Sequence, residues 1–204
     1  MEKKRIAVLA SGRGSNFLAL AQAAQVSDFP GEIVVLISDN ADAPVLAYAA
    51  QFGIEALWLD PGFKRTFLTP DVEARWIEEL RRRKVDLICL AGFMRVIKAG
   101  MLEEFRGRIL NIHPSLLPSF PGLDAQKQVF DWGAKVAGCT VHFVDDSLDG
   151  GPIIVQRCVP VLGNDTTETL AERILEQEHK AYPEAVRLWC EGRLQIAGRR
   201  VIIT

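Results

Sequence analysis

The sequence predicts an α/β fold in which helices flank a mainly parallel central sheet, with an antiparallel extension in the C-terminal part. Three observations support this prediction. Apolar runs without polar alternation recur along the first half of the chain, helix-like segments separate them, and the pattern changes to two adjacent strand-like runs after residue 112. A chain of 204 residues with 49% hydrophobic residues has enough apolar mass for one domain with a substantial core.

Four apolar runs read as strands buried on both faces, because they lack alternation and end at Gly, Ser or Asp. They are residues 6–10, 32–38, 54–59 and 85–92, and a fifth run follows at 108–112. Helices are expected at 16–26, at 43–52 before Gly53, and at 71–84 after Thr69-Pro70. Strands that alternate with helices favour right-handed crossovers, and therefore a parallel sheet.

The second half of the chain has a different pattern. Residues 138–146 and 151–161 are strand-like and only the short segment "SLDG" separates them, which predicts an antiparallel pair added at the edge of the sheet. Residues 166–190 predict one long helix, or two that join near Pro183. With no linker or repeat, the simplest organisation is a single domain over residues 1–204.

Composition argues against several classes of protein. A net charge of −2 with mixed signs gives no basic footprint for nucleic acid and no polybasic arm for a membrane. The charged start leads directly into a strand-like run, not into a signal-peptide core, so we expect a cytoplasmic protein. The four cysteines lie far apart and the chain has three histidines and no C-x-x-C, so neither disulfides nor a metal site are expected.

The stretch "SGRGSN" (11–16) lies between the first strand and the first helix. Small residues there let backbone N–H groups approach a ligand, and the helix N-terminus favours an anion such as phosphate. The dinucleotide fingerprint would require glycine where the chain has Phe17, although Asp39 after the second strand keeps NAD binding open. The alternative is a tight turn that binds nothing, with Asn16 as the helix cap.

A second group of polar residues follows the fourth and fifth strands. In "NIH", strand geometry places Asn111 and His113 on the same face. The acidic, glycine-rich stretch "DDSLDGG" (145–151) could bring a carboxylate to His113 and hold its ring protonated. An amide, an imidazolium and a carboxylate together suit a reaction in which a carbonyl oxygen becomes negative. The alternative for His113 alone is a structural role.

The other two histidines are less informative. His142 alternates with Val141 and Phe143, so a buried structural role and a place in the site are equally open. His179 is expected to be structural or to support the site from behind.

Five motifs in this order, "SGRGSN", "LAGFMRVI", "LNIHPSLLPSFPG", "TVHFVDDSLDGGPIIVQ" and "EQEHKAYPEAV", resemble the glycinamide ribonucleotide transformylases, a folate-dependent family. The similarity spans about residues 6 to 196. It implies the Rossmann-like formyltransferase fold, with a phosphate-binding half over about 1–100 and a folate-binding and catalytic half over about 101–204. It also implies formyl transfer from 10-formyltetrahydrofolate to the amine of glycinamide ribonucleotide in purine biosynthesis, without a metal.

The resemblance implies roles for individual residues. The catalytic asparagine, histidine and aspartate of the family match Asn111, His113 and Asp149. The ribonucleotide would be bound by Gly14, Ser15, Asn16 and Glu178. The folate would be bound by Arg65, Leu90, Met94, Arg95, Val96, Ile97, Asn111, Val144, Asp145 and Asp146.

The chain departs from the family in two places. Asp124 and Gln126 stand where the family often has histidines, and the family's arginine before an aromatic residue matches either Lys64 or Arg65. Arg65 is preferred because its planar guanidinium suits phosphate or carboxylate.

Small-molecule substrates are the expected partners, and the protein is expected to be a monomer or homodimer. Another formyltetrahydrofolate enzyme, such as the hydrolase or the methionyl-tRNA formyltransferase, is the nearest alternative, but each would need an additional domain. A non-catalytic nucleotide-binding module is more remote.

Overall fold

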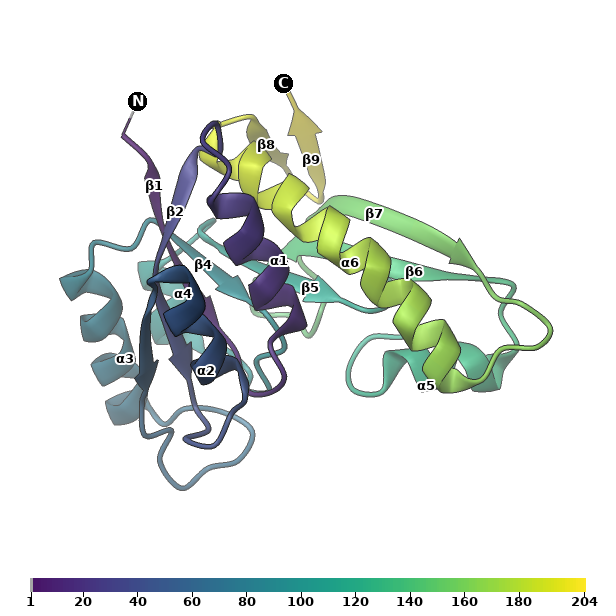
Figure 1. Ribbon diagram of the computed structural model, residues 1–204, viewed down its shortest axis with the longest axis horizontal. Helices are drawn as coiled ribbons and strands as arrows, with labels where there is room; N and C mark the ends of the chain where they lie inside the picture. The colour runs from purple at the N-terminus through teal and green to yellow at the C-terminus, as the bar shows by residue number, and fades with distance from the viewer. Residues whose placement is uncertain (1) are drawn as a thin grey trace. The chain divides into compact units, whose positions relative to one another are not determined.

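The computed structural model describes residues 2–204 and divides into two compact units, one ending at Leu110 and one comprising Asn111–Thr204. Both contain strands and covering helices (Figure 1). The predicted α/β class with a mostly parallel sheet and antiparallel C-terminal strands is confirmed.

The first unit has a parallel sheet in the order β3-β2-β1-β4. Its strands are β1 (Lys4–Leu9), β2 (Gly31–Ser38), β3 (Glu55–Trp58) and β4 (Leu87–Leu90). Its helices are α1 (Ser15–Ala24), α2 (Val45–Ala49), the 3-10 turn η1 (Ala50–Phe52), α3 (Pro70–Arg82) and α4 (Ala99–Glu104). The predicted start at Thr69-Pro70 is confirmed, because Thr69 is the N-cap residue of α3, without a side-chain capping bond, and Pro70 is the first residue of the helix.

Two expectations for this unit need correction. Strand β3 is not buried on both faces: Glu55, Ala56 and Trp58 are exposed, because β3 is the outer strand of this unit's sheet. The helix expected at 43–52 is a short α-helix that tightens into η1 before Gly53, where φ is +67°. Helix α4 was not predicted.

The second unit has the strand order β5-β6-β7-β9-β8. Its strands are β5 (Ile109–His113, which begins in the first unit), β6 (Val136–Phe143), β7 (Ile153–Pro160), β8 (Leu194–Ala197) and β9 (Arg200–Ile203). The predicted antiparallel pairing of β6 with β7 is confirmed, but β7 does not form the edge, because β9 pairs with it in parallel and β8 pairs with β9.

Helix α6 (Thr167–Cys190) packs on β6 and β7, and α5 (Ala125–Trp132) lies against α6 (Figure 1). The sequence left open one long helix or two helices that join near Pro183, and α6 is one continuous helix that passes through Pro183. Packing of its buried face, which includes Ile174, Tyr182 and Val186, compensates for the backbone hydrogen bond that the proline cannot donate. Helix α5 and the β8–β9 hairpin were not predicted.

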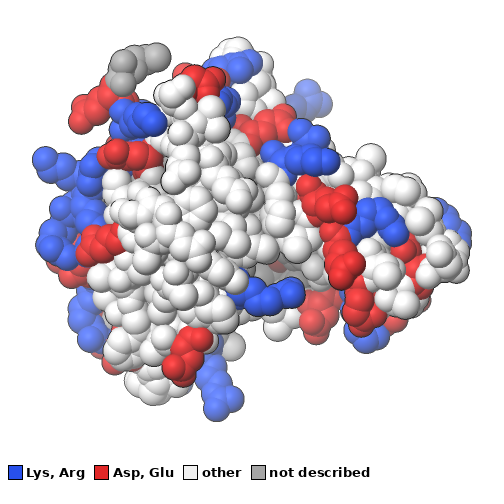
Figure 2. All heavy atoms as spheres, in the orientation of Figure 1, with Lys and Arg blue, Asp and Glu red and all other residues white. Residues whose placement is uncertain are grey.

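Burial of apolar side chains stabilises each unit. Strands β1 and β4 contribute fully buried residues such as Val8 and Ile88 to the core of the first unit, and β6 does the same with Val141 in the second unit. Each such side chain contributes about 1.5–3 kcal/mol relative to exposure. On the face drawn in Figure 2, basic and acidic side chains lie beside one another. Ion pairs such as Arg81–Glu104 join side chains of opposite charge in the first unit. No helix among residues 2–204 is both long and apolar enough to cross a bilayer.

The turn between β1 and α1 depends on Gly14. Its φ is +82°, and a Cβ built on it would lie 2.3 Å from the Cγ2 atom of Val45. Backbone N–H of Val45 donates to the carbonyl of Gly12 at 3.2 Å, so the glycine loop and the start of α2 are in close contact. Gly14 therefore meets both a conformational and a steric requirement.

We predict that Gly14→Ala lowers the free energy of unfolding by about 1–3 kcal/mol, because it combines a left-handed backbone with a steric overlap. Gly12→Ala is the matched control, since a Cβ at Gly12 meets nothing within 4 Å. Urea unfolding followed by circular dichroism measures both. Equal stabilities of the two variants would contradict the requirement at Gly14.

Candidate active site

Three polar side chains meet around the carboxylate of Asp149 in the second unit. His113, the last residue of β5, places its Nδ1 atom 3.4 Å from Oδ2 of Asp149. The Nε2 atom of His142, on β6, lies 3.9 Å from Oδ1 of the same carboxylate and 3.3 Å from Nδ2 of Asn111. The structure therefore brings together all three predicted catalytic residues, with Asn111 and His113 on one face of β5, and adds His142.

The contacts of His113 indicate its charge state. Its Nε2 donates to the backbone carbonyl of Phe120 at 2.9 Å, while Nδ1 faces the Asp149 carboxylate. Either neutral form of the ring would direct a nitrogen lone pair at one of these two oxygens. Only the imidazolium presents an N–H group to both, so this buried ring, 5% exposed, suits a positive charge.

His142 has the opposite arrangement. Its Nδ1 donates to the carbonyl of Phe143 at 2.8 Å, which leaves Nε2 as the acceptor for the Asn111 amide. The ring is 2% exposed. Alternation along β6 indicated only that His142 faces inward, and the sequence carried no signal that its partner would be Asn111.

A buried polar network holds the segment that follows His113. The hydroxyl of Thr140, on β6, donates to the carbonyl of Ser115 at 2.7 Å and accepts the backbone N–H of Leu117 at 3.0 Å. The amide of Gln156, on β7, donates to the Leu117 carbonyl at 2.9 Å. Because Ser115 and Thr140 are fully buried, these bonds fix the loop against the sheet.

The loop beyond this network carries the carbonyl that holds His113. Phe120 has a φ of +54°, and its ring packs edge-on against the exposed Trp132 of α5, with 6.4 Å between the ring centroids. The N–H of Gly122 donates to Oδ2 of Asp149 at 2.8 Å. One loop thus contacts both His113 and Asp149.

Asp124 and Gln126, where the family often has histidines, lie at the start of α5. Asp124 is the N-cap residue, with a φ of +54° and no side-chain capping bond. Its conformation makes the turn into the helix.

In the first unit, Gly14, Ser15 and Asn16 lie at the N-terminus of α1. The helix begins at Ser15 after Gly14, so Asn16 is not the cap that the alternative reading expected. The hydroxyl of Ser11 accepts the backbone N–H of Met94 at 2.9 Å, which joins the glycine loop to the 91–97 segment. Phe17, where a dinucleotide fold needs glycine, is a fully buried core residue.

Asp39, which kept NAD binding open, has another partner. Its Oδ2 atom accepts a hydrogen bond from Nε of Arg95 at 2.6 Å, and both side chains are about nine-tenths buried. Arg95 also donates to the carbonyl of Lys64. The Asp39 carboxylate, which kept NAD binding open, is instead part of an ion pair that joins three segments of the first unit.

The remaining predicted folate contacts of this unit differ in exposure. Met94 and Val96 expose 61% and 45% of their surface, whereas Leu90 and Ile97 are buried. The N–H of Val96 donates to the Thr66 carbonyl at 2.8 Å, so the loop that carries the exposed Arg65 lies beside this segment.

The other predicted residues of the second unit lie on α6 and on the 144–149 loop. Glu178 is 5% exposed. Burial of the Cys139 thiol, and to a smaller extent the negative charge of Glu178, raises the pKa of that thiol to about 12. Asp145 accepts the backbone N–H of Ser147 at 2.9 Å, Val144 is half-buried and Asp146 is exposed. Among residues 2–204, no three His, Cys, Asp or Glu side chains are grouped as metal ligands.

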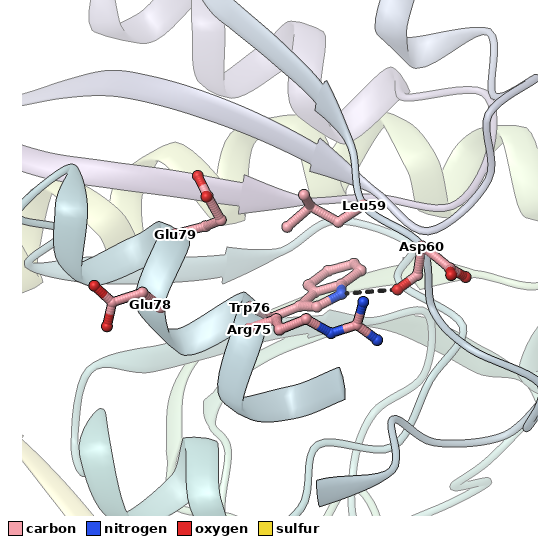
Figure 3. Close-up of a pocket in the computed structure, with 6 residues that line it drawn as sticks. All are labelled: Leu59, Asp60, Arg75, Trp76, Glu78 and Glu79. Carbon is pink, nitrogen blue, oxygen red and sulfur yellow. Dashed lines mark hydrogen bonds between the residues drawn. The ribbon is translucent and has the colours of Figure 1, made fainter. Parts of the chain in front are cut away.

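A separate hollow of about 280 Å³ lies between the end of β3 and α3 (Figure 3). It is lined by Leu59, Asp60, Arg75, Trp76, Glu78 and Glu79. The indole N–H of Trp76 donates to the Asp60 carbonyl at 3.4 Å, and the indole is 1% exposed, so the ring serves the core. None of the predicted site residues lines this hollow.

Comparison with known proteins gives a consistent family. The chain is 43% identical to the phosphoribosylglycinamide formyltransferase of Bacillus subtilis, over 90% of this chain and 93% of that protein. The crystal structure of glycinamide ribonucleotide transformylase 1 from Symbiobacterium toebii is 51% identical and superposes with a TM-score of 0.94, covering 98% of this chain and 94% of that one.

A longer relative is also similar. The trifunctional purine biosynthetic protein adenosine-3 of Drosophila melanogaster is 44% identical over 96% of this chain, which spans only 14% of that protein's length. The formyl transferase family model matches residues 4–186. With this match over most of the chain, and with relatives of similar length such as the one from Bacillus subtilis, the chain belongs to the formyl transferase family.

Proposed function

We propose that this protein transfers the formyl group of 10-formyltetrahydrofolate to the amine of glycinamide ribonucleotide, in purine biosynthesis. The observation that carries the proposal is the pairing of a buried His113 with Asp149, beside the amide of Asn111. Relatives named for this activity match nearly the whole chain at about 40–50% identity, which supports the choice of substrates.

The chemistry requires a group that stabilises negative charge on the formyl oxygen. The ribonucleotide amine attacks the formyl carbon and forms a C–N bond, while the carbonyl electrons move to oxygen. The second N–H of Asn111, beyond the one directed at His142, donates to that oxygen. Nε2 of His113 donates as well, once the formyl oxygen replaces the Phe120 carbonyl as its acceptor.

Collapse of the intermediate restores the carbonyl and breaks the bond to N10 of the folate. The amine loses a proton and N10 gains one, so the overall transfer is balanced. The imidazolium of His113 is placed to relay this proton, and Asp149 stabilises the ring while it carries the charge. In this scheme the formyl carbon is the electrophile, and Asn111 and His113 supply the hydrogen-bond donors that stabilise the oxyanion.

The other predicted residues are assigned to the two substrates. The N-terminus of α1, with Gly14, Ser15 and Asn16, is assigned to the ribonucleotide phosphate, and Glu178 is assigned to its glycinamide end. Exposed apolar surface on Met94 and Val96 suits a flat pterin ring. The remaining folate contacts are assigned to Arg65, Leu90, Arg95, Ile97, Val144, Asp145 and Asp146.

The side chain of Arg95 already binds Asp39, so its contact with folate is assigned to the backbone. The proposal keeps a single formyltransferase domain over residues 1–204. The proposed protein is cytoplasmic and a monomer or homodimer.

We predict that purified protein releases tetrahydrofolate from 10-formyltetrahydrofolate only when glycinamide ribonucleotide is present. A spectroscopic assay with and without the ribonucleotide tests this. Turnover that does not depend on the ribonucleotide would instead identify a hydrolase, and binding of the ribonucleotide without turnover would identify a non-catalytic module.

Replacement of the central carboxylate should separate chemistry from folding. Asp149→Asn keeps an oxygen for the Gly122 N–H but removes the negative charge beside His113, so kcat should fall by at least about 100-fold. Asp131→Asn, which breaks only an exposed pair with Lys127, is the control. Steady-state kinetics of both variants measures the loss of activity, and thermal unfolding shows whether they are folded. An Asp149→Asn enzyme with full activity is incompatible with the mechanism.

The function requires His142 to stay neutral so that Nε2 can accept from Asn111. Burial lowers the pKa of His142, the carbonyl of Phe143 and the charge of Asp149 partly oppose this, and the positive charge of His113 adds to the lowering. Burial likewise lowers the pKa of His179 on α6. Both imidazoles therefore bind a proton less readily in the folded chain than in the unfolded chain.

The lower pKa of the two imidazoles in the folded chain makes the protein less stable at acidic pH. As the pH falls below about 6.5, the unfolded chain takes up protons first, so the free energy of unfolding decreases until the folded imidazoles also titrate. We predict that His142→Gln has a smaller loss of stability between pH 7 and pH 5 than the wild type, measured by urea unfolding at each pH. His179→Gln should show a similar reduction.

The pKa of Asp165 lies well below its usual range because of Arg173, so its contribution is lost only at a lower pH, outside this window. A slope for His142→Gln equal to that of the wild type would show that His142 is not held neutral by burial.

A further inference from the structure

The C-terminal hairpin reaches the loop that carries Asp149. Strand β9 pairs in parallel with the start of β7 through Arg200 and Ile153, directly after the 145–151 loop. Strands β8 and β9 pair from Leu194↔Ile203 to Ala197↔Arg200, which leaves Gly198 and Arg199 as a two-residue turn. Gly198 has a φ of +62°, as such a turn requires.

One side chain at this turn makes a specific contact. The guanidinium of Arg199 donates from Nη2 to the backbone carbonyl of Gly150 at 2.7 Å. Gly150 follows Asp149 in the chain, so the hydrogen bond holds the Gly150–Gly151 peptide, one peptide unit beyond the residue whose carboxylate faces His113. Arg199 and Gly150 are 49 residues apart in sequence, and the contact exists only because β9 is held against β7.

The Asp149 loop needs such an anchor. Asp149 has a φ of +50°, which is unfavourable for a residue with a side chain. A Cβ at Gly151 would lie 1.8 Å from the carbonyl of Phe143, so the chain passes very close to the end of β6 there. On the other side, the Gly122 N–H holds the Asp149 carboxylate at 2.8 Å. These contacts and Arg199 together determine where the carboxylate points.

We propose that Arg199 is a positioning residue for formyl transfer, which holds the Gly150 peptide so that Asp149 keeps its contact with His113. The proposal rests on the proposed catalytic role of Asp149. It assigns a function to the C-terminal hairpin, whose residues take no part in the reaction themselves.

The test compares three variants of the full chain. Arg199→Ala should lower kcat for formyl transfer by roughly five- to tenfold with little change in KM, because the hydrogen bond orients the catalytic carboxylate and does not bind substrate. Arg199→Lys, which keeps a donor and a charge, should recover part of this loss. Arg200→Ala is the matched control, because Arg200 is the next exposed arginine of the hairpin and contributes its backbone to the pairing.

A double-variant cycle separates positioning from a general structural effect. If Arg199 acts through Asp149, addition of Arg199→Ala to Asp149→Asn should lower kcat no further than Asp149→Asn alone. Additive losses in the cycle, or an Arg199→Ala kcat equal to that of Arg200→Ala, would overturn the proposal.

A measurement without turnover keeps the proposal independent of the proposed function. The imidazole ¹⁵N resonances of His113 report its contact with Asp149, and amide hydrogen exchange at Gly150 and Gly151 reports the loop. Arg199→Ala should change both, and Arg200→Ala neither.

Unchanged His113 resonances in Arg199→Ala would overturn the positioning role, even if the loop exchanges faster. If the wild type shows no formyl transfer while these signals respond as expected, the proposed function fails and the positioning of Asp149 by Arg199 stands.

Discussion

The carboxylate of Asp149 faces two imidazole rings while its own backbone has a φ of +50°. Neither condition is favourable for an isolated loop, because the conformation costs about 1–3 kcal/mol and a buried charge needs partners. The second unit meets both conditions with contacts from several elements. The end of β5 supplies His113, β6 supplies His142, and the N–H of Gly122 supplies a donor. Much of the packing around β5 and β6 can be understood as support for this one group.

The same carboxylate lies beside two histidines whose hydrogen bonds differ. Phe120 and Asp149 present oxygens to both nitrogens of His113, an arrangement that suits two N–H donors. His142 has one carbonyl acceptor and one amide donor, so it is neutral. Two identical side chains within one cluster thus have different roles, and the difference comes from the neighbouring backbone carbonyls and the Asn111 amide. The arrangement places a histidine suited to donate from both nitrogens next to one that accepts at Nε2, with the Asp149 carboxylate beside both.

Much of the fold followed from the sequence, and the exceptions have physical causes. Strands β1, β2 and β4 were predicted because strands that are buried on both faces need continuous apolar runs. Strand β3 has a similar run, but hydrophobicity alone does not reveal that a strand lies at an edge and leaves Trp58 half-exposed. The β8–β9 hairpin was missed because its short strands are mostly exposed and contribute little to the apolar pattern.

The candidate site was predictable to a similar extent. The period of two along β5 correctly placed Asn111 and His113 together, since that depends only on local geometry. The resemblance of the motifs selected Asp149 from three nearby aspartates, which composition and spacing could not do. The Asn111–His142 contact and the Arg199–Gly150 bond depend on strand order and loop conformation, and no local pattern encodes them. For Asp39, the sequence indicated a strand-end carboxylate but not its arginine partner.

The edge-on contact between Phe120 and Trp132 has a practical consequence. Trp132 is 81% exposed, so its fluorescence depends on solvent and on the few groups that it touches. Phe120 provides both that ring contact and the carbonyl that occupies Nε2 of His113. A substrate that takes this carbonyl's place must move the residue against which the indole packs. Trp132 is one of four tryptophans in the chain, so a variant in which the other three are replaced would carry its own optical reporter, and its emission would follow release of His113 in real time without an attached dye.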